Sequence, residues 1–461
     1  MSWFRPSEEK LLQCAKNLSP YFVEALDLRI SVRLWDGSIL PLGKNSDPNI
    51  YLSISDAGVF GSLLRRPSVE NMLMHYARGQ IDFHGADLLT FIEALRVKNS
   101  RKRTKSIPKW AVARELIPFL FAPAKPTPVD PSLRANGNEQ QKPGADNRPL
   151  IQFHYDVGNE FYKLFLDETM VYSCAYFTDW DNSLEQAQFD KLDLICRKLQ
   201  LQPGERFLDI GCGWGALVCH AAEHYGVTAH GVTLSQAQLD LAKERIKSLG
   251  LEDRVRVELK DYNELEGRFD KIASVGMIEH VGIANIPNYM AKVHSLLPDR
   301  GMYLNHGITR PAKKSRRKFK RIRPEQRLMR KYIFPGGELD HIGHTIESME
   351  SRGFRVHDVE NLRDHYGLTC RHWCQRLWEN RDEATRLVGN ERYRLWLLYL
   401  AGVSFSLGEG ALCLFQTLGV KHSAKGHSRM PPTRGHLYEP KSSITETKEL
   451  ARVEPCSAFM N

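Results

Sequence analysis

The sequence predicts an α/β fold with a mostly parallel sheet, preceded by a smaller α+β unit. After residue 200, apolar segments typical of strands alternate with helical segments. This alternation is typical of βαβ crossovers, which give parallel strands covered by helices on both faces. A turn with three glycines follows the first of these strands, and a proline-rich segment separates them from the first 122 residues. These observations predict two folded units within 461 residues.

The first 122 residues predict the smaller unit. Arg29–Leu34 alternates as a strand, Asp36-Gly37 supplies a turn, and Ser38–Pro41 fits the second strand of a hairpin. Helical segments are expected at Ser55–Leu64, Val69–Arg78 and Gly85–Leu95. This unit carries no chemical signature. Residues 123–149 contain six prolines and predict a flexible linker, because such a composition leaves nothing to pack.

Residues 150–420 predict the larger unit. Strands are expected at Phe207–Ile210, Thr228–Thr233, Val255–Lys260 and Lys271–Val275, and helices at Ala216–Tyr225, Ser235–Leu249 and Ile286–Leu297. Val359–Leu362 and Leu412–Val420 fit as later strands. The apolar stretch Leu395–Val420 has Glu409 between two glycines, which favours a buried helix, a turn and a strand over a membrane span. Residues 421–461 lack periodicity and are expected to be disordered.

Composition and charge restrict the classes of protein that fit. Hydrophobic residues make up 42% and charged residues 26%, as in ordinary globular proteins. The polar start Met1–Lys10 predicts that there is no signal peptide, and nine cysteines without CxxC pairs predict a reducing cytoplasm. The net charge of +9 is uneven, because residues 313–331 hold eleven Lys or Arg and one acid, and residues 98–109 hold six more. Such runs attract nucleic acid or anionic lipid headgroups, although the shorter one fits a solvated loop equally well.

The glycine turn predicts a nucleoside cofactor. Glycines at 211, 213 and 215 let the backbone approach a ligand at the carboxyl end of a strand. Thr233 stands where dinucleotide-binding sheets commonly have an acid, which weakens an NAD interpretation, and Ser235 fits a helix N-cap. Asp261-Tyr262 closes the third strand and could meet an adenine. Each residue alone is more often structural, but together they follow three successive strands.

Six motifs, in order, resemble those of the cyclopropane-fatty-acyl-phospholipid synthases, a family that includes the mycolic acid cyclopropane synthases. They lie at His154–Asn159, Met170–Phe177, Leu208–Gly215, Gly231–Ser235, Ser274–Gly282 and Tyr332–Gly337. The resemblance spans about residues 150 to 420, and the N-terminal unit resembles the extra domain of bacterial members. It implies a class I S-adenosylmethionine methyltransferase with a Rossmann-like fold.

The resemblance also implies a reaction, cyclopropanation of cis double bonds in the acyl chains of membrane phospholipids. The alkene takes the methyl of S-adenosylmethionine, and loss of a proton from the new methyl closes the ring. The family holds bicarbonate as the base. By resemblance, its ligands are Cys174, Glu279, His306, Ile308 (through its backbone) and Tyr366, and the cofactor ligands are Tyr172, Ser173, Gly211, Gly213, Thr233, Gln238 and Tyr262.

Plainer interpretations of several of these residues stay open. Cys174 lies in an aromatic-rich segment, where a buried cysteine is usually inert packing. Glu279-His280 could begin a metal pair, but no third ligand follows at a useful spacing, so no metal is expected. His306 could simply end a strand, and His154 and Asp156 fit a helix cap, with a family role in shaping the cofactor lid.

Two departures from the family pattern stand out. Val403 takes the place of a second cysteine that these enzymes often carry, and the segment between His306 and Tyr332 is more basic than usual.

The expected partners are unsaturated, anionic phospholipids. The protein is expected to reach them from the cytoplasmic side as a peripheral membrane protein, and a homodimer is a family-level expectation. The rival hypotheses are a lipid methyltransferase giving methyl-branched or methylene chains, a nucleic-acid methyltransferase, and a non-catalytic lipid-surface protein. No nucleic acid is expected as a partner, because no target-base motif is present.

Overall fold

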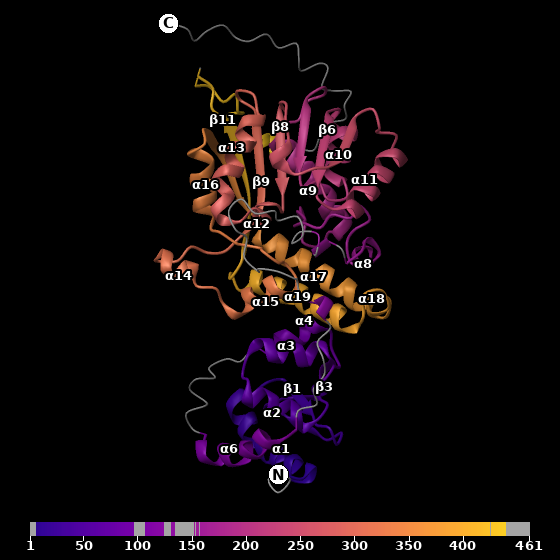
Figure 1. Cartoon of the computed structure of the whole chain (residues 1–461), viewed down its shortest axis with the longest axis vertical. Helices are drawn as coiled ribbons and strands as arrows, with labels where there is room; N and C mark the ends of the chain where they lie inside the picture. The colour runs from indigo at the N-terminus through magenta and orange to yellow at the C-terminus, as the bar shows by residue number, and fades with distance from the viewer. Residues whose placement is uncertain are drawn as a thin grey trace.

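The structure is a computed structural model that describes residues 6–95, 107–123, 131–133, 152, 154–155, 157–424 and 426–438. Two units are stacked along its long axis (Figure 1). The N-terminal unit lies at one end and the large sheet near the other, with the helices α17 (Arg363–Glu379), α18 (Arg381–Val388) and α19 (Asn390–Gly408) between them. The α/β fold expected from the sequence is confirmed.

The N-terminal unit contains a four-stranded sheet of strand order β2-β1-β3-β4. Its elements are α1 (Glu8–Leu26), β1 (Ile30–Arg33), β2 (Ile39–Pro41), β3 (Asp47–Ile54), α2 (Ala57–Arg65), α3 (Val69–Ala77), β4 (Ile81–His84), α4 (Leu88–Ala94), α6 (Lys109–Leu116) and the 3-10 helix η1 (Ile117–Phe121). The predicted hairpin is present, with Val32 opposite Leu40. The predicted helix at Gly85–Leu95 begins later, at Leu88, because the Asp87 carboxylate caps the amides of Leu89 and Thr90.

The larger unit is built on a seven-stranded sheet of order β10-β11-β9-β8-β5-β6-β7. Its strands are β5 (Arg206–Ile210), β6 (Thr228–Thr233), β7 (Val255–Leu259), β8 (Lys271–Val275), β9 (Met302–Thr309), β10 (Phe354–Asn361) and β11 (Cys413–Lys421). Strands β5 to β9 run parallel, whereas β11 pairs antiparallel with β9 and β10. The carboxyl ends of the parallel strands therefore meet at one edge, where open α/β sheets bind ligands.

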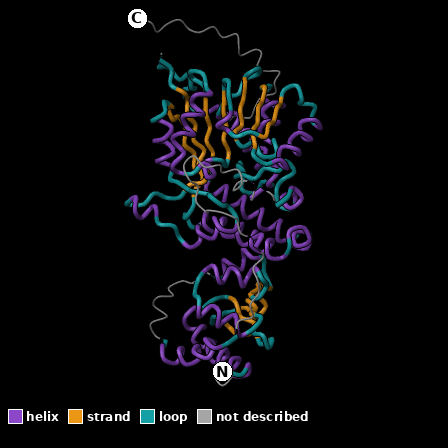
Figure 2. The backbone as a smooth tube through the Cα atoms, viewed as in Figure 1, coloured by secondary structure: helices purple, strands orange, loops and turns teal. Residues whose placement is uncertain are grey.

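Helices cover both faces of this sheet (Figure 2). They are α9 (Leu184–Lys198), α10 (Ala216–Tyr225), α11 (Gln236–Ser248), α12 (Ile278–Val281), α13 (Ile286–Leu296) and α16 (Ile342–Glu350); α8 (Asn159–Lys163), α14 (Arg316–Lys320) and α15 (Pro324–Tyr332) lie nearer the N-terminal unit. The stretch Leu395–Val420 forms the end of α19, a turn and β11, as predicted. Across the described ranges, no helix combines the length and apolar character needed to cross a bilayer.

Buried polar contacts join the two units. Arg394 of α19 is 8% exposed and donates to the carbonyls of Tyr76 (2.7 Å) and Ile81 (3.0 Å) and to the Asp82 carboxylate (2.8 Å). Nearby, Lys331 and the Tyr332 hydroxyl both donate to the Glu70 carboxylate, at 2.6 and 2.8 Å. The N-terminal unit is thus held against α15 and α19 by charge-assisted bonds.

Parts of the expected linker and tail are ordered. Most of residues 123–149 lie outside the described residues, but Pro131–Leu133 forms a 3-10 turn whose Leu133 is buried in the core of the larger unit. The expected disorder after residue 420 is also wrong as far as Tyr438. Lys421 ends β11, Leu437 is 4% exposed, and Arg434 pairs with Asp358 at 3.0 Å. Leu133 packs in the core in the first segment, and the second is held by the buried Leu437 and by the Arg434–Asp358 ion pair.

Candidate functional site

The loop after β5 has the geometry of a cofactor cradle. The amides of Gly211 and Cys212 both donate to the Val232 carbonyl at 3.0 Å, which fixes the loop against β6. Gly211 and Gly213 have φ angles of +83° and +54°, which glycine adopts most readily. A Cβ atom on Gly213 would meet no described atom within 4 Å, whereas one on Gly211 would lie 2.3 Å from the Met277 side chain. The space beside Gly213 is therefore open to a ligand.

Polar side chains follow the next two parallel strands at the same edge. The Thr233 hydroxyl donates to the Gln238 side-chain oxygen at 2.7 Å and accepts from the Ser235 amide at 3.2 Å. Ser235 caps α11 by accepting from the Gln238 amide, as predicted. Tyr262 begins a short 3-10 turn after β7 and packs edge-on against Tyr289, with ring centroids 4.8 Å apart. The expected cofactor ligands Gly211, Gly213, Thr233, Gln238 and Tyr262 thus lie at three adjacent strand ends.

A cavity of about 1800 Å³ opens beside the carboxyl ends of β8 and β9 and extends to the N-terminal unit, whereas Gly211, Gly213, Thr233, Gln238 and Tyr262 do not line it. All five residues expected to bind the anion line it, and we call them the anion set: Cys174, Glu279, His306, Ile308 and Tyr366. Tyr172 and Ser173, expected to bind the cofactor, line it as well. The structure therefore brings together members of the anion set that lie up to 192 positions apart in the chain, from Cys174 to Tyr366.

Glu279 is the one carboxylate of the anion set. It follows β8 on α12, and its Oε1 accepts from the Ile308 amide at 2.5 Å. Its Oε2 is buried and has no hydrogen-bond partner among the described residues. Burial raises the pKa of this carboxyl to about 7, against the opposing effect of the Ile308 amide. Glu279 can therefore be neutral near physiological pH and offer a proton to an anion.

His306 lies within β9, opposite Gln416 of β11. The strand continues to Thr309, so the interpretation that His306 merely ends a strand is wrong. Its Nδ1 lies 3.2 Å from the Gln416 side-chain nitrogen, and its buried Nε2 has no partner in the described part of the chain. Burial holds the pKa of His306 well below its usual value, so the ring is neutral. With Gln416 donating to Nδ1, the proton lies on Nε2, the atom left without a partner.

Cys174 and Tyr366 complete the set as neutral groups. Cys174 is fully buried, and its thiol lies 3.1 Å from the Ala175 carbonyl and 3.8 Å from the Leu362 carbonyl. Burial raises the pKa of the Cys174 thiol and of the Tyr366 phenol. Two buried atoms without a described partner, Glu279 Oε2 and His306 Nε2, thus belong to residues that line the cavity beside these neutral donors. This donor set fits a small anion such as bicarbonate.

His154 does not cap a helix, contrary to one prediction. Its ring stacks between Phe334 and Trp396, at centroid distances of 3.8 and 5.1 Å, and its Nδ1 lies 2.9 Å from the Ile333 carbonyl. Helix α8 instead follows Gly158 and has no side-chain cap. Burial lowers the pKa of His154 to about 3, so the ring is neutral. Its aromatic contacts join the motifs at 154–159 and 332–337; Asp156 lies outside the described residues.

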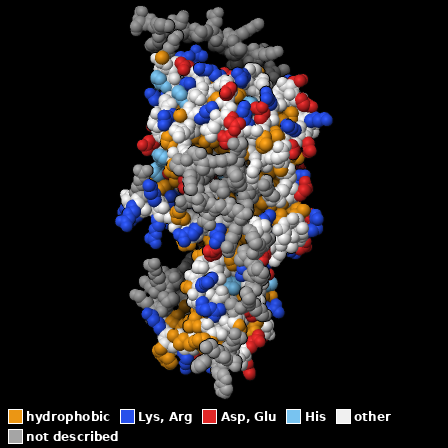
Figure 3. Space-filling view, in the orientation of Figure 1, with side chains coloured by type: hydrophobic (Ala, Val, Ile, Leu, Met, Phe, Trp, Pro, Cys, Tyr) orange, Lys and Arg blue, Asp and Glu red, His pale blue; other side chains and the backbone are white. Residues whose placement is uncertain are grey.

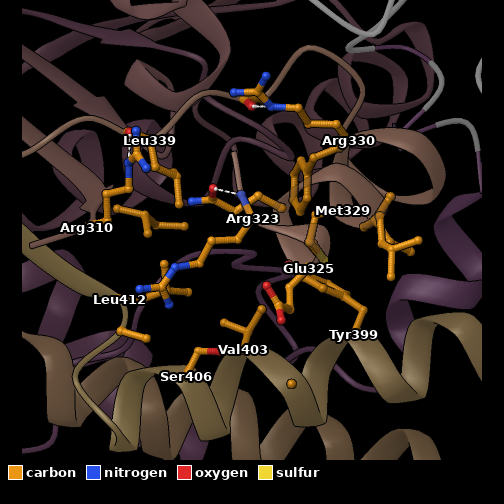
Figure 4. Close-up of a pocket in the computed structure, with 18 of the residues that line it drawn as sticks. Arg310, Arg323, Glu325, Met329, Arg330, Leu339, Tyr399, Val403, Ser406 and Leu412 are labelled. Carbon is orange, nitrogen blue, oxygen red and sulfur yellow. Dashed lines mark hydrogen bonds between the residues drawn. The ribbon is translucent and has the colours of Figure 1, made fainter. Parts of the chain in front are cut away.

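Val403 lines the same cavity as the anion set. Figure 4 shows it on α19 beside Ser406, facing Glu325 of α15. The family's second cysteine would therefore lie on the cavity wall, where this chain presents an apolar side chain. Across the ranges that the structure describes, no group of three or more His, Cys, Asp or Glu side chains is placed to hold a metal ion.

Lys191 was missed by the sequence analysis. It is 2% exposed on α9 and donates to the Ser173 hydroxyl at 3.0 Å, with Asp209 and Asp167 as its nearby acids. Asp209, on β5, has a buried Oδ1 without a described partner, and burial raises the pKa of its carboxyl to about 7. The available signal was helical spacing, because Lys191 stands four residues from Ala187 and Ile195 on the buried face of α9.

We expect Lys191→Met to weaken S-adenosylmethionine binding about tenfold, because the Ser173 hydroxyl loses a charged donor in a buried site. Burial lowers the pKa of Lys191 to about 8. The ammonium therefore loses its proton as pH rises through 8, and wild-type affinity should fall there while the variant's affinity stays flat. Calorimetric titration at several pH values would measure both effects.

Lys198→Met is the matched control, because Lys198 is also fully buried on α9. It pairs with Asp358 at 3.0 Å and Glu360 at 2.5 Å, on the far strand β10. Its loss should lower the free energy of unfolding by about 3 kcal/mol and leave cofactor affinity unchanged. Equal effects of the two variants on affinity would contradict the role of Lys191.

The fold and the loop define a class I S-adenosylmethionine-dependent methyltransferase. Among solved structures, the mycolic acid cyclopropane synthase CmaA1 with SAH and CTAB bound is 33% identical, with a TM-score of 0.57, covering 61% of this chain and all of that one. The cyclopropane synthase MmaA2 from Mycobacterium tuberculosis is 32% identical, with a TM-score of 0.56, and the match covers 61% of this chain and all of that one.

This chain belongs to the mycolic acid cyclopropane synthetase family, whose model matches residues 143–417. A probable fatty acid methyltransferase from Pseudomonas putida is 37% identical over 91% of this chain and 98% of its own. Cyclopropane mycolic acid synthase 3 from Mycobacterium tuberculosis is also 37% identical, over 56% of this chain and 92% of its own. The predicted family, fold class and use of S-adenosylmethionine are confirmed.

Proposed function

We propose that the enzyme converts cis double bonds in the acyl chains of membrane phospholipids into cyclopropane rings. The bond from the sulfonium sulfur to the methyl carbon breaks as that carbon bonds to the alkene. Loss of one methyl proton then allows the second carbon–carbon bond to close the ring. The observation that carries this proposal is the single cavity, which is apolar over most of its wall, contains the anion set, and reaches a cationic rim.

The apolar wall fits an acyl chain. The larger unit contributes Leu395, Leu398, Tyr399, Val403 and Leu414, and the N-terminal unit contributes Leu52, Val69, Met72, Leu73, Tyr76 and Phe83. Tyr155, Tyr172 and Tyr366 line the part of the cavity near the anion set. Their rings can face a developing carbocation, and the surrounding apolar side chains exclude water that would trap it.

The rim of the cavity fits a phosphate headgroup. The segment around α14 and α15 lines it with Arg310, Lys313, Lys320, Arg323 and Arg330. Figure 4 shows three of them, Arg310, Arg323 and Arg330. The Arg310 guanidinium stacks 3.7 Å from the Phe319 ring centroid and donates to the Leu339 carbonyl at 2.9 Å. Arg330 donates to the Gly337 carbonyl at 2.9 Å. These contacts hold cations beside an apolar cavity, as an anionic amphipathic substrate requires.

Bicarbonate would be held by Glu279 Oε2 and His306 Nε2, with Cys174 and Tyr366 beside it. When bound, it supplies a proton acceptor that is a poor trap for a carbocation. Glu279 in its neutral form and the His306 Nε2–H donate hydrogen bonds to the anion, and neither of these two groups is itself positively charged. The Ile308 amide, already bonded to Glu279 Oε1, fixes the carboxyl plane.

A methyl-branched or methylene product is the second candidate. It is favoured by the relatives that match most of this chain. The one from Pseudomonas putida and another from Mycobacterium tuberculosis, 33% identical over 80% of this chain, are both named probable fatty acid methyltransferases. The replacement of the family's second cysteine by Val403 on the cavity wall also distinguishes this site.

Product analysis tests the proposal. The purified protein is incubated with S-adenosylmethionine and vesicles of mono-unsaturated anionic phospholipid, and the acyl chains are read by mass spectrometry and proton NMR. A gain of one CH2 with upfield ring protons and no vinyl signal supports cyclopropanation. The same gain with retained vinyl signals supports the second candidate, whether the new carbon is a methylene or a methyl branch on the alkene, because a gain of CH2 alone leaves either a ring or a double bond. No gain overturns both and directs the test to RNA.

The exposed cations of α14 and α15 are proposed to hold the enzyme at anionic membranes. Side chains of Lys and Arg gather over α14 in Figure 3. Arg317→Glu/Lys318→Glu/Arg321→Glu should weaken vesicle binding by about 3 kcal/mol or more, since each cation near such a surface contributes about 1 kcal/mol. Cofactor affinity should not change. Co-sedimentation with anionic vesicles measures the loss, with Lys243→Glu/Lys247→Glu on α11 as the control; equal losses in the two variants would contradict the assignment.

A further inference from the structure

The N-terminal unit exposes a compact group of large apolar side chains on α6 and η1. Trp110 is 71% exposed, Ile117 53%, Leu120 42% and Phe121 55%. We call these four residues the apolar patch. Figure 3 shows apolar side chains gathered over this end of the molecule. Exposure of four large apolar residues within twelve positions costs free energy unless a partner covers them.

The patch is held in a fixed conformation. Between its outward residues, Phe119 is fully buried and Ala122 is 2% exposed, so η1 is anchored by its inner face. The Arg65 guanidinium of α2 donates to the carbonyls of Leu120 (2.8 Å) and Ala122 (3.1 Å), and more weakly to that of Phe119 (3.4 Å). These bonds fix Leu120 and Phe121 on the outside of the unit.

The exposed charges on α6 are basic. Lys109 is exposed at the start of α6, and Arg114 lies 5.9 Å from the Trp110 ring centroid with a side chain 68% exposed. The acid within residues 107–123 is Glu115, which is buried, accepts from Asn17 and pairs with Arg114. A Trp and a Phe among apolar side chains, with cations beside them, match the interface of an anionic bilayer.

The patch is also near one wall of the cavity. Helix α2, which anchors η1 through Arg65, places Leu63 on the cavity wall. In the view of Figure 3, the patch and the basic side chains over α14 lie on the same side of the molecule. A bilayer on that side would meet the cationic rim of the cavity and the patch together.

We propose that the apolar patch inserts into the interfacial layer of an anionic phospholipid bilayer. The α14 and α15 cations supply long-range attraction, and the patch supplies contact that does not depend on charge. This inference rests on the proposed lipid substrate, but it concerns binding and requires no turnover.

The test compares Leu120→Gln/Phe121→Gln with wild type in co-sedimentation with anionic vesicles at low and high salt. Both side chains are exposed, so the fold should tolerate the change. We expect binding at least about tenfold weaker, and the deficit should persist at high salt, because burial of apolar surface is not screened. Leu249→Gln, 46% exposed at the end of α11, is the matched control and should bind as wild type does.

Trp110 provides a direct measure of how deeply the apolar patch inserts into the bilayer. The difference in fluorescence between wild type and Trp110→Phe isolates this indole, and vesicles containing brominated acyl chains should quench it. An unquenched Trp110 in bound protein, or unchanged binding of the double variant, overturns the proposal. So does a change from dimer to monomer in the double variant with vesicle binding intact, because the patch would then be an interface between two copies. Failure of the product assay with quenching intact would overturn the proposed reaction alone.

Discussion

Glu279→Ala should lower the rate of methyl transfer by about 10²- to 10⁴-fold, the usual contribution of a group that organises proton transfer. The substitution removes an anion-binding atom and leaves the Ile308 amide without its acceptor. S-adenosylmethionine affinity should change little, because the cofactor loop after β5 is a separate structure. Initial rates and calorimetric titration of the cofactor measure the two quantities.

Glu279→Gln separates charge from shape. Because the pKa of Glu279 is raised to about 7, the carboxyl ionises as pH rises through 7 and then repels a bound anion. Wild-type affinity for bicarbonate should therefore decrease across that pH, and the Gln variant should not show the decrease. Glu338→Gln is the control, since Glu338 also lines the cavity and accepts the Ile283 amide at 3.0 Å. Equal effects of the Glu279→Gln and Glu338→Gln substitutions on bicarbonate affinity would contradict the assignment of Glu279 to the anion site.

Gly213→Ala should weaken S-adenosylmethionine binding by about 10- to 100-fold, because the new methyl occupies the open space beside the loop, and overpacking costs about 1–3 kcal/mol. Gly250→Ala is a close control for backbone strain. Gly250 has a φ of +63°, and a methyl group there would also have no described atom within 4 Å, but this residue follows α11 away from the strand ends.

Both glycine variants should lose similar stability, about 1–2 kcal/mol, since each forces a side chain into the left-handed region. Thermal unfolding measures that loss, and titration calorimetry measures the difference in cofactor affinity. If Gly250→Ala weakens cofactor binding as strongly as Gly213→Ala does, the loop after β5 is not the cofactor cradle.

Local signals in the sequence were enough for four of the five parallel strands. Strands β5, β6 and β8 are short and mostly buried runs that helices follow, and β7 is a short strand bounded by turn residues, so pattern alone located these four. The N-terminal sheet was found only in part. Strand β3 is mostly half-buried or exposed and β4 has four residues, so neither has the alternation that identifies a strand. Their pairing depends on contacts far apart in sequence.

The candidate site also has one part that local sequence signals predict and another part that they do not. The glycine loop and Ser235 could be interpreted from the residues themselves, because their roles are local. The anion set could not, since Cys174, His306 and Tyr366 come from a loop, a strand and a helix that only the fold brings together; resemblance to a family supplied them. His154 was misinterpreted because its partners, Phe334 and Trp396, lie about 180 and 240 residues away.

The contacts of Arg394 make the two units depend on each other. Its guanidinium is buried against carbonyls of the N-terminal unit, and that unit also supplies one wall of the cavity. Cutting the chain between the units and separating the pieces would leave a charged group without its acceptors and open an apolar surface to water. The two units therefore form one folded body, and a shortened chain lacking residues 1–122 would need a new polar surface where the N-terminal unit now packs.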